Sequence, residues 1–440
     1  MTDSETESRQ WPEPKSRDVG LFADLRLYAE ALELSLAYGA VSLPFLKREM
    51  GQRLTMMRLV LRQSERAVEG LLRELRAFGW LQTPPGSRES ASTAPHEITA
   101  QGESSLRLYR EDLRQFRRLL AVKMQELYTV PGWFVARLWM INPEGQGELI
   151  LPAPPPAWLP ASRSWDDHDW DAELERRTIE AATKAKEANP SAFPISTCEW
   201  LARVRAAWSR LSTLRPRARR TKRPASYAPR RRLALAMREA TVALLFSAVP
   251  LTGTEPDFPG ERRPLYPRTF SAWCPRLEAL ELIFYTDWHP WMNGRLLFPV
   301  SVFRPSASAL FESVGGIRDP AGHRLWLHQP DWATVRNRFL NTLVSVHQHS
   351  ASRTGTLYVS LQDVRDEVCR QLRISSTSFD CFLAEVVREL PAEDFRWTIA
   401  VESDIRQDQS GGAGQSRRPV YLASVPHTLL AMARLPQSGT

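Results

Sequence analysis

The chain has 440 residues, of which 43% are hydrophobic and 25% are charged, and it contains 15 Trp and 17 Phe. This composition excludes a disordered chain and is that of a globular protein with roughly two to four domains. Basic residues outnumber acidic ones by 58 to 50, so the net charge is +8, which favours an acidic partner such as nucleic acid.

Cysteine spacing and apolar runs exclude further classes. No C-x-x-C pair occurs, which argues against a zinc site and a disulfide framework. Residues 2–18 are polar and unlike a signal peptide, and the longest apolar run, residues 240–251, is shorter than the ~20 residues that cross a bilayer. We therefore expect a cytoplasmic protein without a membrane segment, and reduced, mostly buried thiols at Cys198, Cys274, Cys369 and Cys381.

The chain opens with residues 1–20, which are polar and predict a disordered leader. Apolar residues then recur at the spacing of an amphipathic helix that Gly39 ends. A second helix is predicted over residues 42–50, with Ser42 as its N-cap and Gly51 as its end. The stripe of the first helix consists of Leu21, Leu25, Tyr28, Leu32 and Leu36.

A third helix is predicted over residues 64–78, with Gly79 at its C-terminal end. Residues 80–81 then start a strand, residues 84–95 form a turn-rich loop, and residues 96–99 return as a second strand. The apolar face of the third helix consists of Val68, Leu71, Leu72, Leu75 and Phe78.

Part of this segment carries a family resemblance. The run Leu71-Leu72-x-x-Leu75-x-x-x-Gly79-Trp80-Leu81, followed by Ile98-Thr99-x-x-Gly102, resembles the end of the recognition helix, the wing and the exit in PadR- and MarR-type regulators. The resemblance covers residues 21–128 and implies a winged-helix DNA-binding domain. Residues 52–63 depart from the family pattern because they are extra residues before the third helix.

A long helix follows, and its apolar stripe extends over three heptads. In PadR- and MarR-like proteins the corresponding helix packs across a dimer, so the resemblance implies a homodimer. The alternative is that the stripe packs against its own domain. The residues of the stripe are Leu106, Tyr109, Leu113, Phe116, Leu120 and Leu127.

Residues 131–171 are rich in Pro and Trp, and the proline run at 152–156 predicts a stiff, extended linker. Acidic residues surround His168 in this segment. Carboxylates just before a helix usually complement the positive end of that helix, so we predict no metal site from Asp166, Asp167, Asp169 and Asp171.

The next segment, residues 172–248, contains predicted helices over 172–188, 197–214 and 233–246. It also contains a basic stretch, residues 203–232, with 12 basic residues and no acidic one; subtracting it from the net charge of +8 leaves −4 for the other 410 residues. Arg203, Arg205 and Arg210 lie on a helix. We interpret residues 215–232 as a free arm along a nucleic-acid backbone, with a solvated linker or a contact to an acidic protein as alternatives.

The region 249–330 is irregular and aromatic, with strands expected near residues 280–284 and 296–303. After it, residues 332–347 and two further apolar stripes predict three helices, and residues 357–360 predict a short strand that ends in the N-cap Ser360. A hairpin of residues 397–401 with 420–422 is expected to follow. This order resembles a second winged helix over residues 331–435.

The two winged-helix candidates differ in charge. Residues 44–76 carry eight basic and four acidic residues, whereas residues 356–424 carry eight basic and eleven acidic. Phosphate contacts supply most non-specific affinity, so we expect the first candidate to contact DNA and the second, with Asp380, Glu385 and Glu389 on its third helix, to dock on protein. The predicted nucleic-acid-binding residues are Lys47, Arg48, Arg58, Arg62, Arg66, Arg73, Arg217, Arg219, Arg220, Lys222, Arg223, Arg230, Arg231 and Arg232.

Enzyme motifs are missing from the sequence. We find no phosphate-binding loop G-x-x-x-x-G-K-[ST], no G-x-S-x-G elbow and no H-E-x-x-H helix. His289, His323, His328, His347 and His349 have no carboxylate or Cys at metal-ligand spacing. We therefore predict no enzymatic activity, cofactor or metal.

Together these patterns predict a mainly α fold with small β-hairpins (α+β), in which two winged-helix-like domains flank a helical and irregular middle region. The expected function is non-enzymatic DNA binding, as a regulator or DNA-maintenance factor. The alternative is an assembly or adaptor subunit, resembling winged-helix subunits of chromosome-maintenance or phage-defence complexes. Plasmid replication initiators also pair two winged helices, but here the two units are about 230 residues apart.

Overall fold

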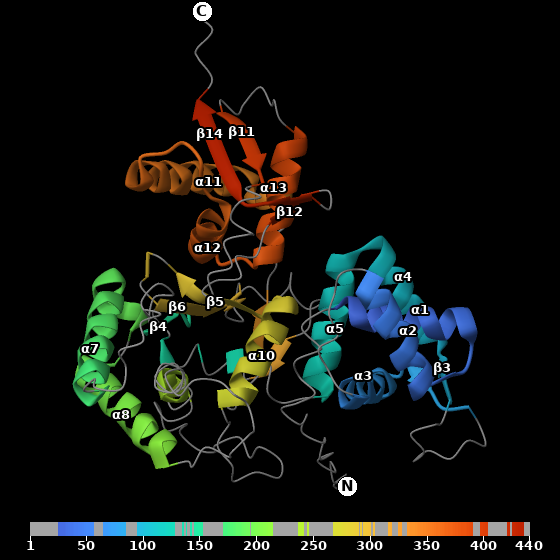
Figure 1. The fold of residues 1–440 in the computed structure, drawn as a ribbon. Helices are drawn as coiled ribbons and strands as arrows, with labels where there is room; N and C mark the ends of the chain where they lie inside the picture. Colours follow the sequence, from blue (N-terminus) through green and yellow to red (C-terminus); the bar gives the residue numbers. More distant parts are fainter. Residues whose placement is uncertain are drawn as a thin grey trace, which may run out of the picture. The chain divides into compact units, whose positions relative to one another are not determined.

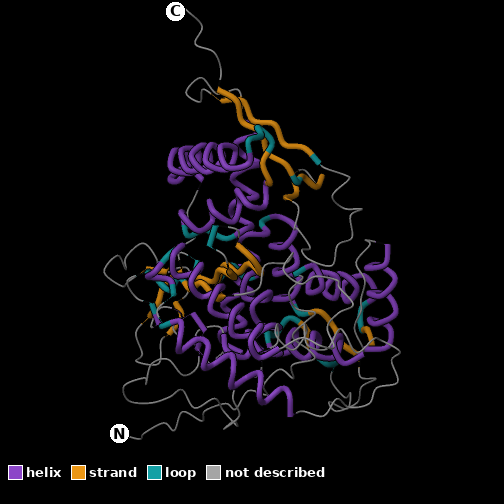
Figure 2. Tube along the Cα trace, turned by 60° about the vertical axis from the view of Figure 1, so that its left-hand side comes forward, coloured by secondary structure: helices purple, strands orange, loops and turns teal. Residues whose placement is uncertain are grey.

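The computed structural model describes residues 25–434 apart from 57–64, 85–94, 128–133, 153–169, 214–235, 246–266, 304–315, 319–323, 328–331, 390–396, 404–419 and gaps of one or two residues. The fold is mainly helical with small antiparallel sheets, as predicted (Figures 1 and 2). Two compact units make up the chain. The first contains Met1–Ala136, Pro250–Leu282 and Glu312–Leu325, and the second contains Arg137–Val249, Ile283–Phe311 and Trp326–Thr440.

The first unit begins with three helices and three short strands, which we call the N-terminal module. Their order is α1 (Arg26–Tyr38), β1 (Val41–Ser42), α2 (Leu43–Met56), α3 (Glu65–Ala77), β2 (Leu81–Gln82) and β3 (Pro95–Ile98). The strands form one sheet in the order β1-β3-β2, with Val41 opposite His96 and Leu81 opposite Ile98.

Capping residues set the ends of these helices as predicted. Gly39 and Gly79 have φ of 71° and 73°, the left-handed conformation that glycine adopts without strain. The hydroxyl of Ser42 accepts a hydrogen bond from the Phe45 amide at 3.4 Å at the start of α2. The expected end at Gly51 was wrong, because α2 continues to Met56; one glycine inside a helix costs only about 1 kcal/mol against Ala.

The long helix expected after the hairpin is two helices, α4 (Ala100–Glu111) and α5 (Leu113–Leu127). Asp112 separates them, with φ of −146° and ψ of 87°. Its carboxylate accepts hydrogen bonds from the amides of Arg114 and Gln115, both at 3.0 Å, so it caps α5. Gly102 lets α4 approach the hairpin, since a Cβ there would lie 2.2 Å from the Trp80 carbonyl oxygen.

A helix from the middle of the chain, α10 (Pro267–Ala279), belongs to the first unit. No helix was predicted there, because only strands were expected between residues 249 and 305; α10 forms although Pro275 lies inside it. Its inner face carries Trp273, Arg276 and Leu277, all buried. The helix therefore adds to a core whose other helices, α1 to α5, precede it by more than a hundred residues.

The second unit contains a three-stranded antiparallel sheet in the order β4-β6-β5, built from β4 (Leu149–Pro152), β6 (Gly294–Pro299) and β5 (Ile283–His289). All four residues of β4 are buried, although they lie inside the segment expected as a linker. A register shift between Thr286 and His289 marks a bulge in β5. The strands expected near residues 280–284 and 296–303 overlap β5 and β6, whereas β4 was missed, because a strand buried at every position shows no alternation of apolar and polar residues.

Helices cover this sheet. The helix α7 (Trp170–Ala188) contacts β4, and α8 (Thr197–Thr213) packs on α7, while α12 (Leu361–Leu372) contacts β5 (Figure 1). Residues 236–241 and 244–245 are also helical. The remaining described elements are the 3-10 turn Pro190–Ala192 and a small sheet of β7 (Val302–Phe303), β9 (Arg324–Leu327) and β8 (Gly316–Arg318).

The last part of the second unit, which we call the C-terminal module, has the order of the N-terminal one with two additional strands, β12 and β13. It consists of α11 (Trp332–Thr354), β10 (Val359–Ser360), α12, α13 (Ser376–Glu389), β11 (Trp397–Glu402), β12 (Val420–Leu422), β13 (Val425–His427) and β14 (Leu429–Arg434). Its sheet has the order β10-β14-β11, so the last strand is again central. The predicted hairpin was wrong: β11 pairs with β14, and β12 pairs with β13 in a separate two-stranded sheet.

The two modules also share a local sequence. The tripeptide Val41-Ser42-Leu43 recurs as Val359-Ser360-Leu361, in each case as strand, cap and first helical residue. The Ser360 hydroxyl accepts a hydrogen bond from the Asp363 amide at 3.3 Å, as Ser42 does from Phe45. In both modules the Val is buried and pairs with the central strand, at His96 and Leu430 respectively.

Candidate functional site

The surface expected to contact DNA lies on α2 and α3 of the N-terminal module. Lys47 and Arg48 project from α2, and Arg73 projects from α3. Arg48 and Arg73 are exposed, while Lys47 is half-buried. Arg66 lies on α3, but its side chain and the predicted residues Arg58, Arg62, Arg217, Arg219, Arg220, Lys222, Arg223, Arg230, Arg231 and Arg232 fall outside the described residues.

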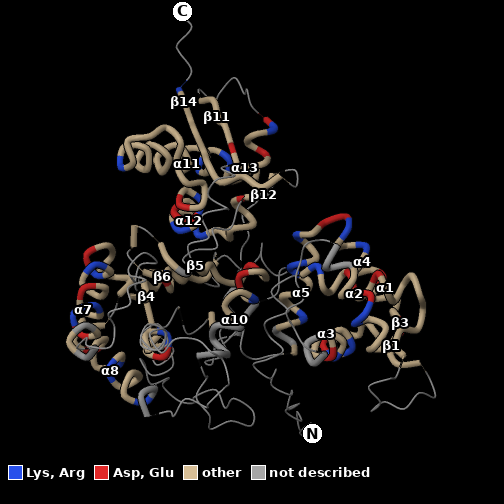
Figure 3. The backbone as a smooth tube through the Cα atoms, in the orientation of Figure 1, with Lys and Arg blue, Asp and Glu red and all other residues tan. Residues whose placement is uncertain are grey.

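Carboxylates accompany the described cations of this surface. The Arg48 guanidinium lies 2.9 Å from Glu49, and that of Arg73 lies 3.4 Å from Glu69, one helical turn away. Figure 3 shows Lys and Arg beside Asp and Glu along α3, not one continuous run of cations. Exposed pairs of this kind hold their partners by at most about 1 kcal/mol, so these arginines can exchange a carboxylate for a phosphate at little cost.

Arg48 also lies in an aromatic cluster. Its guanidinium carbon is 5.4 Å from the ring centroid of Phe45, and the ring of Tyr38 meets the same Phe45 edge-on with centroids 5.0 Å apart. Tyr38 is 58% exposed at the end of α1. The sequence patterns did not identify this cluster, because Tyr38 and Phe45 belong to two different helices.

The inner face of α3 holds a buried ion pair. Arg276 of α10 donates from Nη2 to both carboxylate oxygens of Glu74, at 2.6 and 2.7 Å, and Tyr28 of α1 donates to the same carboxylate at 2.6 Å. The Arg276 and Glu74 side chains are 0% and 2% exposed. The face of Trp273 lies 4.8 Å from the Arg276 guanidinium. This pair fixes α3 against α1 and α10.

The first arginines of the basic stretch are paired within the second unit. Arg203 lies 2.7 Å from Glu199, Arg205 pairs with Glu175 of α7, and Arg210 lies 2.5 Å from Glu239. These three side chains therefore stabilise α8 and its neighbours. The structure confirms that these three arginines lie on a helix, while the predicted arm, residues 215–232, lies outside the described residues.

The stripe expected at a dimer interface mostly packs inside the first unit. Leu106, Phe116, Leu120 and Leu127 are buried, and Phe116 contacts the rings of Trp80 and Tyr109 with centroids 5.8 and 5.2 Å apart. This is the packing expected from the alternative prediction, in which the stripe packs against its own domain. Leu113 is 40% exposed at the start of α5 and is the residue of the stripe still available to a second copy.

The acidic residues of α13 all have basic partners in their own module. Asp380 lies 3.5 Å from Arg365, Glu385 pairs with Arg388, and Glu389 lies 3.0 Å from Arg336. The Trp332 indole also donates to Glu389 at 2.9 Å. Hydrogen bonds from Trp332 and Arg336 lower the pKa of Glu389. The exposed surface of α13 is thus less acidic than its sequence suggested.

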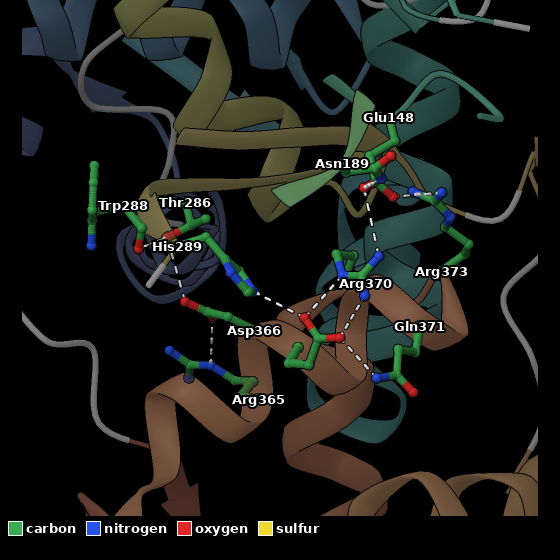
Figure 4. Close-up of polar contacts among 11 residues, drawn as sticks. Glu148, Asn189, Thr286, Trp288, His289, Arg365, Asp366, Arg370, Gln371 and Arg373 are labelled. Atoms are coloured by element: carbon green, nitrogen blue, oxygen red, sulfur yellow. Dashed lines mark hydrogen bonds and ion pairs between the residues drawn. The ribbon is translucent and has the colours of Figure 1, made fainter. Parts of the chain in front are cut away.

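A buried polar cluster joins α12 to the sheet of the second unit (Figure 4). Glu367 of α12 accepts hydrogen bonds from Arg370 at 2.6 and 2.9 Å and from Gln371 at 2.8 Å. Glu148, which directly precedes β4, lies 2.7 Å from Arg373 and 3.6 Å from Arg370, and accepts a hydrogen bond from Asn189. Both glutamates are almost completely buried.

His289, at the end of β5, belongs to the same cluster (Figure 4). Its Nε2 lies 3.4 Å from Glu367, and its side chain is 0% exposed. Burial lowers the pKa of His289 to about 4, against the opposing effect of Glu367. Beside it, Thr286 donates to Asp366 at 3.4 Å. The imidazole is therefore neutral at pH 7 and closed to solvent, and its contacts join β5 to α12.

Sequence reasoning missed this cluster because its members come from distant segments. Glu148 lay in a segment expected as a linker, and His289 ends β5, a strand that was only partly predicted. On α12 the charged residues fall between the apolar positions Leu361, Val364 and Val368, which normally places them in solvent. No local signal showed that a second surface covers them.

Comparison with protein-family models, curated proteins and solved structures gives no match to this chain. Within the described ranges, no three His, Cys, Asp or Glu side chains are grouped so that they could hold a metal ion. In the same part of the chain, no helix combines the length and apolarity that crossing a membrane requires.

Proposed function

We propose that this protein is a non-enzymatic, cytoplasmic DNA-binding protein with two winged-helix modules, of which the N-terminal one contacts DNA. The observation that supports it most is the shared topology of the two modules. In each, a helix, a short strand and two helices precede two strands that complete a three-stranded sheet, and the last strand is central; the C-terminal module has the additional strand pair β12 and β13 between them. That is the order of winged-helix proteins such as the PadR- and MarR-type regulators.

Charge supports assigning DNA contact to the N-terminal module. Its outer helices display Lys47, Arg48 and Arg73, whereas the position that corresponds to Arg48, counted from the shared Val-Ser-Leu tripeptide, is Asp366 in the C-terminal module. Phosphate contacts require cations. The predicted arm, residues 215–232, would extend the same contact along the backbone.

The test is binding of a fluorescently labelled duplex, followed by anisotropy over a range of salt concentrations. Each neutralised phosphate contributes about −0.9 to the log-log slope of affinity against salt. Replacing Lys47, Arg48 and Arg73 by Ala is expected to make the slope shallower by about 2 to 3. The matched control removes three exposed cations of the second unit, Lys186, Arg338 and Arg434, and is expected to leave the slope unchanged.

The outcome that overturns the proposal is undetectable binding of the unmodified protein to any duplex at low salt. Equal changes of slope in the two triple variants would also contradict it, because the effect would then reflect net charge and not a contact surface.

A second candidate function, assembly with a protein partner, is favoured by the surface of the C-terminal module. Leu357, Tyr358, Val387 and Val425 are 50%, 43%, 38% and 51% exposed there. Exposed apolar side chains on a module with paired charges suit protein docking better than phosphate contact. Co-purification from the host decides between the functions, since a stoichiometric partner that survives nuclease treatment supports assembly.

A further inference from the structure

The aromatic cluster at the turn between α1 and α2 is exposed to solvent, unlike the aromatic residues of the core, and could therefore contact a ligand. Leu36 through Ala40 are all exposed, and Leu36 and Tyr38 are 44% and 58% exposed. The ring of Phe45 is half-buried below Tyr38, with centroids 5.0 Å apart and planes at 66°. A tyrosine ring is thus in contact with Phe45 and still more than half exposed to solvent.

Cations stand directly beside this aromatic pair. The Arg48 guanidinium carbon lies 5.4 Å from the Phe45 centroid, and its side chain is 64% exposed. Lys47 precedes it on α2. Aromatic faces bind nucleobases by stacking, and an adjacent guanidinium can hold the phosphate that follows the base. An apolar surface of a partner protein would not pair with these cations, whereas a phosphate would.

The C-terminal module provides an internal comparison, because the same turn there lacks these features. Counted from the shared Val-Ser-Leu tripeptide, Asp363 and Asp366 occupy the positions of Phe45 and Arg48. An exposed tyrosine is present, but the hydroxyl of Tyr358 donates to Glu402 at 2.9 Å. Neither aspartate provides an aromatic ring or a cation, and Asp366 is buried, so the pairing of Phe45 with Arg48 has no counterpart at these positions of the C-terminal module.

We propose that Tyr38, Phe45 and Arg48 form a stacking site for an unpaired nucleobase, with Arg48 on the neighbouring phosphate. The inference rests on the proposed DNA binding and adds a ligand class to it: DNA with a single-stranded end or an extruded base. The base would lie on the Tyr38 ring, and Phe45 would hold that ring in place.

The experiment compares two probes with equal numbers of phosphates. One is a labelled duplex with a short single-stranded overhang, and the other has the same overhang built from abasic nucleotides. The unmodified protein is expected to prefer the probe with bases by on the order of tenfold. Tyr38→Leu is expected to abolish the preference and Tyr38→Phe to retain it, because stacking needs a ring and not merely an apolar side chain.

Tyr358→Leu is the matched control and is expected to keep the preference of the unmodified protein. Equal affinity for both probes overturns the stacking site while duplex binding itself stays intact, and no affinity for either probe overturns the proposed DNA binding as well. A preference that Tyr38→Leu leaves unchanged also overturns the site. The site is also overturned if the unmodified protein is a dimer without any preference for bases and Tyr38→Leu dissociates that dimer. The cluster would then be a contact between two copies of the chain.

Discussion

Arg276 and Glu74 form an ion pair in the core of the first unit, 2.6 Å apart and 202 residues apart in sequence. Both side chains are buried, and Tyr28 donates to the same carboxylate. The pair ties α10 to the N-terminal module within the first unit, because it fixes α3 from a segment that lies far along the chain.

Removing one partner of this pair is expected to destabilise the protein by about 3–5 kcal/mol, since the other charge stays buried without compensation. Glu74→Leu and Arg276→Met test this singly in denaturant unfolding. The double variant is expected to lose much less than the sum. The exposed pair Arg110 and Glu33, 3.0 Å apart, is the control, with about 0–1 kcal/mol expected for its variants. Additive losses at Arg276 and Glu74 would contradict the coupling.

The buried His289 predicts a pH dependence of stability. Its pKa is about 4 in the folded protein against 6.5 for the free group. Between these values the unfolded chain binds a proton that the folded chain does not, so stability falls as the pH decreases from 6.5 to 4, by about 3 kcal/mol in total. His289→Gln is expected to remove this part of the slope.

The measurement is urea unfolding at several pH values, compared between the unmodified protein and the variant. His349→Gln, which changes an exposed histidine, is the control and should keep the slope of the unmodified protein. The same slope in all three proteins would show that His289 does not carry the effect.

The two serine caps predict matched losses of stability. Ser42→Ala and Ser360→Ala each remove a hydroxyl that accepts a hydrogen bond from the first turn of a helix, which costs about 1 kcal/mol. Ser345→Ala, at an exposed position inside α11, is the control and should change stability by no more than a few tenths of a kcal/mol. Calorimetry distinguishes these values, and a cap variant as stable as the control would refute the assignment.

The basic arm predicts a change in salt dependence. Replacing Arg217, Arg219, Arg220, Lys222 and Arg223 by Ser is expected to make the salt slope of DNA affinity shallower by up to about 4.5, if all five contact phosphates. An unchanged slope in the anisotropy titration would return this stretch to the role of a linker.

Self-association through α5 predicts a role for Leu113, the exposed residue of the apolar stripe. If copies meet there, Leu113→Asp is expected to shift the protein from dimer to monomer in sedimentation velocity, with little loss of stability because the side chain is 40% exposed. Ile179→Asp, at a 37% exposed position on α7, is the control. A monomeric unmodified protein at micromolar concentration would contradict the dimer.

Local chemistry determined most helices and their ends from the sequence alone. Gly79 ended α3, Ser360 started α12, and the spacing of Phe379, Phe382 and Val386 fixed α13, because capping and periodicity act within a few residues. The mainly helical class followed from the same patterns. The concentration of positive charge in residues 203–232 is likewise evident from the sequence alone.

Tertiary structure alone decided which distant residues meet. Arg276 and Glu74 look like solvent-exposed charges in the sequence, and the same is true of Glu367 and Glu148. They are buried only because other segments of the folded chain pack over them. Tyr38 and Phe45 likewise come together only through a turn between helices. Strand pairing was decided in the same way: β11 pairs with β14 and not with β12. Long-range strand pairing depends on packing rather than on local propensity.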